Sequence, residues 1–440
     1  MQILPFSLSE LAPQFGAVAG LWWIWLPIML LVIFHQFWLA YVRAKFKMTT
    51  RWVLLEIRIP RELKRSPKAM EQIFAGMYGL RNAPGDLIEY YIDGEVTYWF
   101  SLEMVSFSGD IHFYIRCPAK HRNIIESLFY AQYPDIEIAE TTDYVSTLPR
   151  NAHEMEQAGY RLWGSELKLA KADAYPIRTY MEFSSPVEEE QLDPVSALME
   201  VLGKARRGEK IFVQVLVRPA DDAWVEGVEM LLNKLKHSTA LRPKEPTSEV
   251  EAISYSTIQR TPGETDLLKA MDRNITKPGF ETIIRLAYLA PKDIFSNIIV
   301  RRGVYSCFNQ YAVPNMNSFK HNYKVRTEAK WIHFPHVFPD WRRRIKERRL
   351  WRNFRERRMP EETAGSELVG SDFLGSVIAR SQLFVLNTEE LATVWHLPSY
   401  LVLTAPFVKR VESRKMGPPA GLPIFEGGEK TPWSDPGRAA

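Results

Sequence analysis

Residues 96–116 read VTYWFSLEMVSFSGDIHFYIR, two runs of β-branched and aromatic residues separated by the SGD tripeptide at 108–110. Such runs favour strands, and a short Ser-Gly-Asp stretch is typical of a turn. The stretch therefore predicts a β-hairpin with strands at 96–107 and 111–116. This hairpin is the centre of the pattern from which the fold class is inferred.

The segments on either side of the hairpin continue the pattern with helices and strands. They are a strand at 52–59 (WVLLEIRI) that stops at Pro60, a helix at 61–76, a helix at 118–131 and a short strand at 136–138. The resulting order β-α-β-β-α-β is the split βαβ or ferredoxin-like pattern. Residues 48–140 are therefore predicted to form a ferredoxin-like α+β domain.

A second α/β unit is predicted at 176–336, after a connector at 141–175 that lacks periodicity. Its candidate elements are strands at 179–183, 210–217 and 281–289, and helices at 194–205, 224–235 and 291–308. Residues 238–266 are richer in Pro, Ser and Thr and predict an exposed loop. The expected fold class is α+β with two ferredoxin-like units, although no clear internal sequence repeat supports a duplication.

The remaining C-terminal segments are assigned from charge, capping and composition. Residues 337–360 predict an Arg-rich helix, residues 361–410 a strand and a capped helix that complete the second unit, and residues 411–440 a flexible tail rich in Pro and Gly. Asn387 and Glu390 have the spacing of a capping box, which marks the start of the capped helix.

The N-terminal residues 1–47 contain a segment long and apolar enough to cross a membrane. No charged residue lies between Leu11 and Val42, and the apolar core reads AVAGLWWIWLPIMLLVIFHQFWLAY. A helix of about 20 residues crosses the hydrocarbon core of a bilayer. We therefore expect one transmembrane helix, with aromatic residues at its interfaces and a proline within it. The residues that mark this span are Ala17, Trp22, Trp25, Pro27, Trp38 and Tyr41.

The charges beside this span predict its orientation. The basic residues Arg43, Lys45, Lys47 and Arg51 follow it, while only Glu10 precedes it. The positive-inside rule then places the N-terminus outside and the following domains in the cytoplasm, as in a single-pass protein of the cell inner membrane. A cleaved signal peptide is the rival interpretation, but it requires basic residues before a shorter apolar stretch.

The sharpest charge feature is VFPDWRRRIKERRLWRNFRERRMP at 337–360, in which only Glu347 and Glu356 oppose the basic residues between 342 and 358. The basic residues are Arg342, Arg343, Arg344, Lys346, Arg348, Arg349, Arg352, Arg355, Arg357 and Arg358. Three interpretations stay open. The helix binds nucleic acid through phosphates, it lies on anionic lipid near the anchor, or it is a connector whose arginines pair with acidic groups elsewhere.

Sequence motifs of common catalytic and cofactor sites are missing. No P-loop, dinucleotide fingerprint, G-x-S-x-G elbow or H-E-x-x-H occurs, and Cys117 and Cys307 lack a metal-type partner in the sequence. A net charge of +4 is too small to identify a nucleic-acid binder by itself. The sequence thus predicts no enzyme, cofactor or metal site, and an enzyme without a recognisable motif is the remaining alternative.

Two further segments are IHFYIRCPAKHRNIIESLFYAQYPDIEIAE at 111–140 and LNTEELATVWHLPSYLVLTAPFVKRVESRKMGPPAGLP at 386–423. They resemble the non-catalytic N-terminal region of bacterial membrane-anchored ATPases of the type IV secretion and conjugation class. In that family an anchor and α/β domains precede a P-loop motor. A pattern like the one around Glu390, Trp395 and His396 typically lies just ahead of the motor domain.

The chain ends at Ala440, where the motor would begin, and it carries no Walker motif, so the family's ATP hydrolysis is not carried over. The resemblance implies an accessory membrane subunit that positions a P-loop ATPase on a separate chain. It also implies that Glu390, Trp395 and His396 belong to a docking or closing helix, unless His396 and Pro398 merely finish a packed helix.

We therefore expect a non-enzymatic, single-pass membrane scaffold that positions a separate ATPase at the inner membrane. The alternative is a membrane-tethered protein that binds nucleic acid, for example DNA, through the helix from Arg342 to Arg358. The sequence leaves open whether the chain forms an oligomer.

Overall fold

The computed structural model describes residues 22–60, 63, 65–183, 192–240, 261–331, 336, 338–360, 381–399 and 410–411. Ala17, most of the predicted loop at 238–266 and nearly all of the predicted tail at 411–440 lie outside these residues. The side chains of Trp22 and Trp25 lie outside the description as well.

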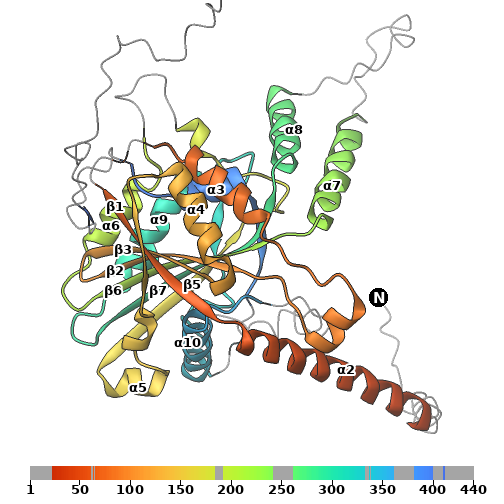
Figure 1. Cartoon of the computed structure of the whole chain (residues 1–440), viewed down its shortest axis with the longest axis horizontal. Coiled ribbons are helices and arrows are strands. Elements are labelled where there is room, and N and C mark those ends of the chain that lie inside the picture. The colour runs from red at the N-terminus through yellow and green to blue at the C-terminus, as the bar shows by residue number, and fades with distance from the viewer. Residues whose placement is uncertain are drawn as a thin grey trace, which may run out of the picture.

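Ten strands within the described residues form one sheet, in the order β10-β1-β3-β2-β6-β7-β5-β8 (Figure 1). β4 also pairs with β1, and β9 also pairs with β7. The strands are β1 (Trp52–Pro60), β2 (Phe100–Phe107), β3 (Asp110–Pro118), β4 (Glu137–Thr141), β5 (Tyr160–Leu169), β6 (Lys210–Pro219), β7 (Gly279–Pro291), β8 (Phe319–His321), β9 (Phe384–Asn387) and β10 (Arg410–Val411). The protein is therefore a mixed α+β structure built on a large, mainly antiparallel sheet.

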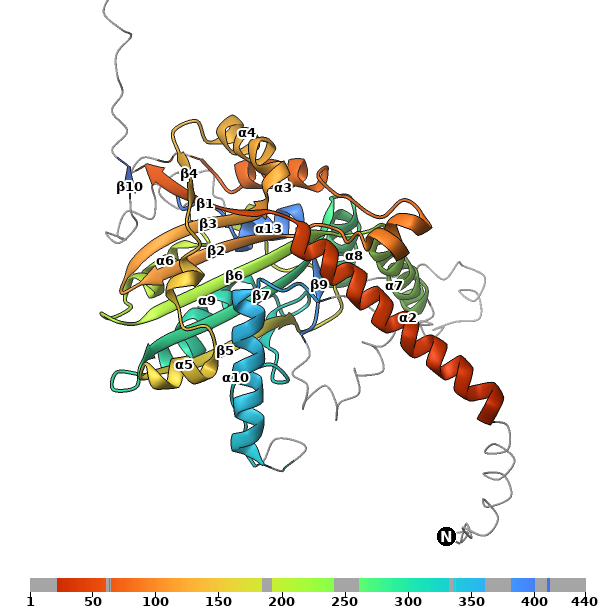
Figure 2. The ribbon, with the colours of Figure 1, turned by 60° about the horizontal axis from the view of Figure 1, so that its bottom comes forward.

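Helices cover both faces of this sheet, as Figure 2 shows for α3 and α4 on one side and α10 on the other. The first face carries α3 (Lys68–Tyr78), α4 (Arg122–Gln132), α6 (Ser196–Gly203), the π-helix η7 (Ile299–Val304), α9 (Tyr305–Phe308) and α13 (Thr388–Val394). The second face carries α5 (Ala152–Gln157) and α10 (Pro339–Arg355). Two further helices, α7 (Ala223–Ala240) and α8 (Pro262–Ile275), pack against each other beside the sheet.

The predicted hairpin is confirmed as β2 and β3. Phe107 lies opposite Asp110, so only Ser108 and Gly109 form the loop. Both have positive φ, +56° and +100°, as the tight turns that match the twist of paired strands require. A Cβ at Gly109 would also lie 3.0 Å from the carbonyl oxygen of Gly203, so the turn packs closely against the end of α6.

The sheet consists of two halves that repeat one strand order. The first half, residues 52–141, has the order β4-β1-β3-β2, and the second half, residues 160–321, has the order β8-β5-β7-β6. The halves join where β2 pairs antiparallel with β6, from Phe100 opposite Val217 to Phe107 opposite Lys210. The pair α7 and α8 is inserted between β6 and β7. One continuous sheet therefore serves both halves.

The connector predicted at 141–175 is wrong, because this segment contains α5 and β5. β5 pairs with β7 on one side and with β8 on the other, and it is buried on both faces. A strand covered on both faces has no polar face, so the alternation that sequence reasoning relies on is absent. The second half therefore begins at Tyr160 and not near residue 176.

Two smaller predictions in the second half are also wrong. Residues 179–183 contain a 3₁₀ turn, η4 (Tyr180–Glu182), where a strand was expected. The long helix expected from residue 291 starts only at η7, because β7 continues to Pro291 and turns follow it. In both places a few apolar residues near a proline fit either element. Contacts with distant segments decide between them: Tyr180 N donates to Thr393 Oγ1 of α13 at 2.8 Å, and β7 pairs with β5 as far as Pro291.

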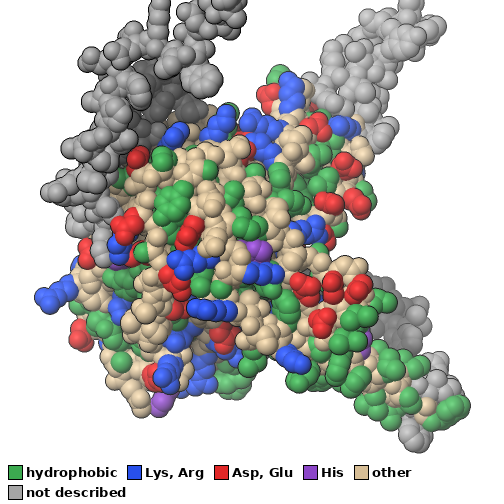
Figure 3. Space-filling view, viewed as in Figure 1, with side chains coloured by type: hydrophobic (Ala, Val, Ile, Leu, Met, Phe, Trp, Pro, Cys, Tyr) green, Lys and Arg blue, Asp and Glu red, His purple; other side chains and the backbone are tan. Residues whose placement is uncertain are grey.

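The N-terminal helix α2 (Trp22–Thr49) is long and apolar enough to cross a membrane over Leu26–Thr49, and length and composition alone also fit a signal sequence. Pro27 lies within it. Its outer part is almost entirely hydrophobic and stands away from the domain (Figure 3). Leu31 and Phe37, for example, are 68% and 72% exposed. Trp38 and Tyr41, two of the residues that mark the predicted span, are exposed as well.

Candidate functional site

The segment 384–399 closes the domain by joining the two halves. β9 pairs with β7 of the second half, and α13 packs against α3 of the first half. The predicted capping box lies between them and is confirmed. Asn387 Oδ1 accepts a hydrogen bond from Glu390 N at 2.8 Å, and Glu390 Oε2 accepts one from Asn387 N at 3.0 Å.

The three side chains expected to dock a partner all lie in the interior. Glu390, Trp395 and His396 are 2%, 0% and 1% exposed. Trp395 packs between Phe74 and Phe113, with ring centroids 6.5 Å and 6.2 Å away. The structure therefore corrects the docking interpretation of these residues. They finish a packed helix, and their burial removes them from contact with any other molecule.

His396 is held by a buried pair with Asp193. His396 Nε2 lies 2.8 Å from Asp193 Oδ1, and His396 Nδ1 lies 2.8 Å from the carbonyl oxygen of Ala392. Both ring nitrogens face acceptors, so the hydrogen bonding is complete when each carries a proton. Burial opposes the charge of Asp193, but His396 and hydrogen bonds from Ser399 outweigh it and lower the pKa of Asp193 to about 2.

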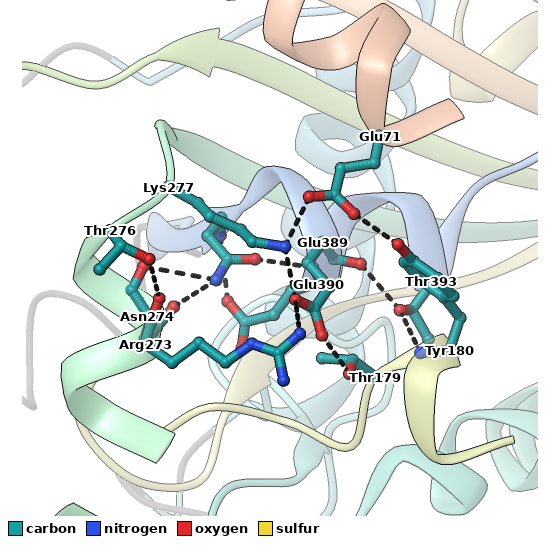
Figure 4. A network of polar contacts seen from close by, with 11 residues as sticks. Glu71, Thr179, Tyr180, Arg273, Asn274, Thr276, Lys277, Glu389, Glu390 and Thr393 are labelled. Carbon is teal, nitrogen blue, oxygen red and sulfur yellow. Dashed lines mark hydrogen bonds and ion pairs between the residues drawn. The ribbon is translucent and has the colours of Figure 1, made fainter. Parts of the chain in front are cut away.

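Glu389, the neighbour of Glu390, meets a group of charges instead of the core (Figure 4). Lys277 Nζ lies 2.6 Å from both Glu71 Oε1 and Glu389 Oε2, and Arg273 Nη2 lies 3.0 Å from the same Glu389 oxygen. Thr179 Oγ1 donates a hydrogen bond to Glu389 Oε1. We call these five residues the Glu389 cluster.

The groups of the Glu389 cluster stabilise one another's charges. Burial disfavours a charged Lys277, but its hydrogen bonds to Glu389 and Glu71 outweigh burial and raise the pKa of Lys277. Burial likewise disfavours the Glu389 carboxylate, yet hydrogen bonds from Lys277 and Thr179 lower the pKa of Glu389. The ion pairs of the cluster join α3, α8 and α13. Because each of its cations is paired with a carboxylate, the cluster offers no free reactive group.

A cavity of about 210 Å³ opens beside the Glu389 cluster and is lined by Thr179, Lys269, Arg273, Asn274 and Glu389 among others. Pockets that hold a small-molecule ligand usually measure about 300–1,000 Å³ and are mostly apolar. This cavity is smaller, and two of the charges at its border, Arg273 and Glu389, are already paired with each other. It therefore fits ordered water better than a substrate.

A row of polar side chains crosses the other face of the sheet, beneath the end of α10. Neighbouring strands place Glu103, Gln214, Arg285 and Glu166 side by side in register, and all four are buried. Arg285 Nε donates to Glu166 Oε1 at 2.8 Å, and Gln214 Nε2 donates to Glu103 Oε1 at 3.0 Å. Buried charges persist only when they are paired, so this row requires a matching cover.

Arg357 supplies part of that cover. Its guanidinium donates to both oxygens of Glu103, at 2.7 Å and 3.1 Å, and to both oxygens of Asp143, at 2.6 Å and 2.9 Å. Burial opposes a charged Glu103, but Arg357 outweighs it and lowers the pKa of Glu103. Arg357 has φ of +48°, a conformation that non-glycine residues rarely adopt. The chain thus turns sharply after α10 to bring this side chain onto the row.

The ten basic side chains predicted to meet nucleic acid or lipid divide by exposure. Arg342, Lys346 and Arg357 are buried, Arg343, Arg349 and Arg355 are half-buried, and Arg344, Arg348, Arg352 and Arg358 are exposed. The predicted external contact is corrected for the three buried residues, because they bind groups of their own chain. Arg342 donates to the carbonyl oxygen of Lys330, and Lys346 donates to that of Tyr323. Arg357 donates to the carboxylate of Glu103.

A family model described as a domain of unknown function, DUF8128, matches residues 44–409. The match covers the sheet except β10, both helical layers and the closing segment. The chain belongs to the DUF8128 family. No curated protein matches it. The DUF8128 domain thus includes the Glu389 cluster and the polar row, whereas the apolar part of α2 precedes the match.

Sequence reasoning missed the charged residues that the DUF8128 domain buries. Glu103 stands alone in FSLEMVSF, and Arg285 is the only charge in TIIRLAYL. A lone charge in an apolar strand must find a partner inside the protein, so these two positions were the available signal. Glu71 and Lys277 lie in polar surroundings in the sequence and gave no comparable signal.

The buried Glu390 carboxyl makes the DUF8128 domain sensitive to pH. Burial raises the pKa of Glu390 to about 8, even though the backbone N–H groups of Asn387 and Ile177 donate to it. In the unfolded chain the same group loses its proton near pH 4.5. The folded state therefore binds more protons than the unfolded state between these two values.

We expect the contribution of Glu390 to stability to be complete below about pH 4.5 and to be lost as the pH rises through about 8. Each pH unit in this window costs up to about 1.4 kcal/mol. Glu390→Gln keeps the capping geometry but cannot ionise, so it should flatten the decline of Tm with pH in the detergent-solubilised chain. The exposed substitution Glu226→Gln is the control. Equal slopes for Glu390→Gln and the parent would contradict this prediction.

Proposed function

We propose that this chain is a non-enzymatic, single-pass membrane scaffold that positions a separate P-loop ATPase at the inner membrane. The observation that carries the proposal is the outer part of α2, whose apolar side chains no other described residue covers. A bilayer would remove this surface from water, and the domain would then be held at the membrane.

The finer orientation rests on charge. Arg43, Lys45, Lys47 and Arg51 lie where α2 enters the domain. The positive-inside rule supports a cytoplasmic domain and an N-terminus outside the cell inner membrane. Because a signal sequence would instead be removed, retention of α2 in the mature protein belongs to the proposal.

The domain suits a scaffold because one continuous sheet runs through both of its halves and serves as a platform. We propose that its two halves, with orders β4-β1-β3-β2 and β8-β5-β7-β6, are two ferredoxin-like units fused edge to edge. The Glu389 cluster and the Arg357 contacts lock the covering segments onto that platform. The assignment of a P-loop ATPase, and of a type IV secretion or conjugation system, rests on the resemblance of residues 111–140 and 386–423.

The direct test is a crosslinked pull-down of the tagged full chain from native membranes, followed by mass spectrometry. A P-loop ATPase enriched over an unrelated single-pass protein with the same tag would support the scaffold. Its absence from repeated crosslinked samples would count against it. The size of the crosslinked products on a denaturing gel shows whether copies of the chain crosslink to each other as an oligomer.

A second candidate function follows from the exposed arginines of α10. Arg344, Arg348 and Arg352 are each four residues apart and all exposed, so they form one basic stripe along the helix. Such a stripe binds phosphate groups of nucleic acid or of anionic lipid. Figures 1 and 2 show α10 and α2 on the same side of the sheet, a placement that favours lipid near the anchor.

We expect the triple substitution Arg344→Gln, Arg348→Gln and Arg352→Gln to separate these ligands. If the stripe binds DNA, the slope of log K against log salt falls by roughly three, since each phosphate contact releases about one counterion. Filter binding of duplex DNA to the solubilised chain measures the slope. Lys204→Gln, Arg302→Gln and Lys320→Gln remove three exposed charges elsewhere and serve as control. An unchanged slope in the stripe variant rejects nucleic acid as its ligand.

A further inference from the structure

A short segment beside α2 exposes large apolar side chains. Leu87, Ile88 and Ile92 are 74%, 58% and 64% exposed, within the turn that includes the π-helix η1 (Glu89–Asp93). The segment is well formed, because Asp86 Oδ1 accepts hydrogen bonds from the backbone N–H groups of Ile88 and Glu89 at 2.9 Å and 2.8 Å. Three neighbouring exposed apolar side chains in an ordered turn indicate a contact surface.

This segment is fixed to the inner end of α2. Trp38 Nε1 donates to the carbonyl oxygen of Tyr91 at 2.7 Å, and the rings of His35 and Tyr91 lie 5.6 Å apart. The guanidinium of Arg43 lies 5.0 Å from the centroid of the Tyr90 ring. The segment therefore occupies the level of α2 between His35 and Arg43.

Gly94 makes this close approach feasible. It ends η1 with φ of +66°, and a Cβ at this position would lie 2.4 Å from the backbone carbon of Val42. Any other residue would push the segment away from α2. The backbone contact thus sets the height of Leu87, Ile88 and Ile92 along the helix.

The level between His35 and Arg43 is where the apolar run of α2 ends and the basic residues begin. About 20 apolar residues fill the hydrocarbon core of a bilayer, so this level falls at its boundary with the headgroups. Trp38, Tyr41 and the paired Tyr90 and Tyr91 gather there, and aromatic residues are enriched at that boundary.

We propose that residues 87–92 form a second membrane contact, in which Leu87, Ile88 and Ile92 enter the lipid boundary beside α2. The proposal rests on the membrane anchoring by α2 and adds that the domain is held against the bilayer at two points. The charge of Glu89 does not oppose this contact. Its carboxylate accepts a hydrogen bond from Gly85 N at 2.6 Å, and it needs to lie only as deep as the lipid headgroups, where water is present.

The test uses the full chain in phosphatidylcholine vesicles, with an environment-sensitive fluorophore on Ile88→Cys. The native thiols of Cys117 and Cys307 are buried, so labelling is directed to the introduced cysteine. Ile298→Cys, 63% exposed in the second half, is the matched control, and Leu31→Cys reports on the span. Nitroxide-labelled lipids then quench only those fluorophores that touch the bilayer.

We expect lipid nitroxides to lower the emission at Ile88→Cys and Leu31→Cys by about twofold or more, and to leave Ile298→Cys unchanged. Quenching at Leu31→Cys without quenching at Ile88→Cys overturns the second contact while the anchor stands. A blue-shifted but unquenched label at Ile88→Cys also overturns it, because the segment then meets protein, such as a second copy. Lack of quenching at Leu31→Cys overturns the anchor itself.

Discussion

Replacing Arg357 with methionine is expected to lower the free energy of unfolding by about 3–5 kcal/mol, the usual cost of removing one partner from a buried ion pair. Methionine fills a similar volume and shares the cost of the positive φ, so the lost charge accounts for the change. Among the described residues, Glu103 would keep only Ser101, Tyr144 and Gln214 as hydrogen-bond donors while it stays buried. Urea unfolding of the detergent-solubilised chain measures the effect.

Two comparisons make the Arg357 result specific. Arg348→Met removes an exposed arginine from the same segment and should change stability by less than about 0.5 kcal/mol. The double variant Glu103→Gln with Arg357→Met should recover part of the loss, because position 103 then holds no buried carboxylate without its cation. Asp143 is 42% exposed and can be solvated when Arg357 is gone. Equal losses in the single and double variants would contradict the charge argument.

Trp395→Ala is expected to lower the free energy of unfolding by about 3–5 kcal/mol, as for other large aromatic side chains removed from a core. Trp395 is fully buried between α3 and the sheet, so alanine leaves a cavity where the closing segment meets the first half. Its indole N–H has no hydrogen-bond partner among the described residues, so Trp395→Phe should cost much less. The same urea unfolding experiment applies.

The Trp395 prediction also separates the closing role from the docking role. Trp341, on the exposed side of α10, provides a control whose replacement by alanine should have little effect on stability. A Trp395→Ala chain that unfolds like the parent would mean that the closing segment is not needed for the fold. Loss of a crosslinked partner without loss of stability would restore the docking interpretation.

The hairpin and the capping box were predictable because their signals are local. Ser108-Gly109 permits the positive φ that a two-residue loop requires, and the spacing of Asn387 and Glu390 matches the hydrogen bonds of a helix start. β5 was not predictable in the same way. Its polar residues Ser165 and Glu166 are buried and contact His321 and Arg285 from distant segments, so its sequence resembles a connector.

The Arg-rich helix shows a different limit of sequence reasoning. The sequence gives the number of basic side chains but not the partners that bury some of them. Arg357 and Arg348 belong to the same basic run, yet one lies on Glu103 beneath the helix and the other is exposed. The partner of Arg357 is Glu103, which β2 places under the end of α10 and which is far from Arg357 in the sequence. A lone charge in an apolar strand, such as Glu103, is therefore a better sequence signal for a buried ion pair than a run of basic residues.

The position of the closing segment has a consequence for synthesis on the ribosome. β9 and α13 occupy residues 384–394, whereas α2 ends at Thr49. At about 5–20 residues per second, tens of seconds separate the emergence of the anchor from that of the segment that completes both halves. During this interval a chain anchored by α2 would wait at the membrane with the surface of α3 uncovered and part of the β7 edge unpaired. The nascent domain would thus need protection from aggregation until translation passes Trp395.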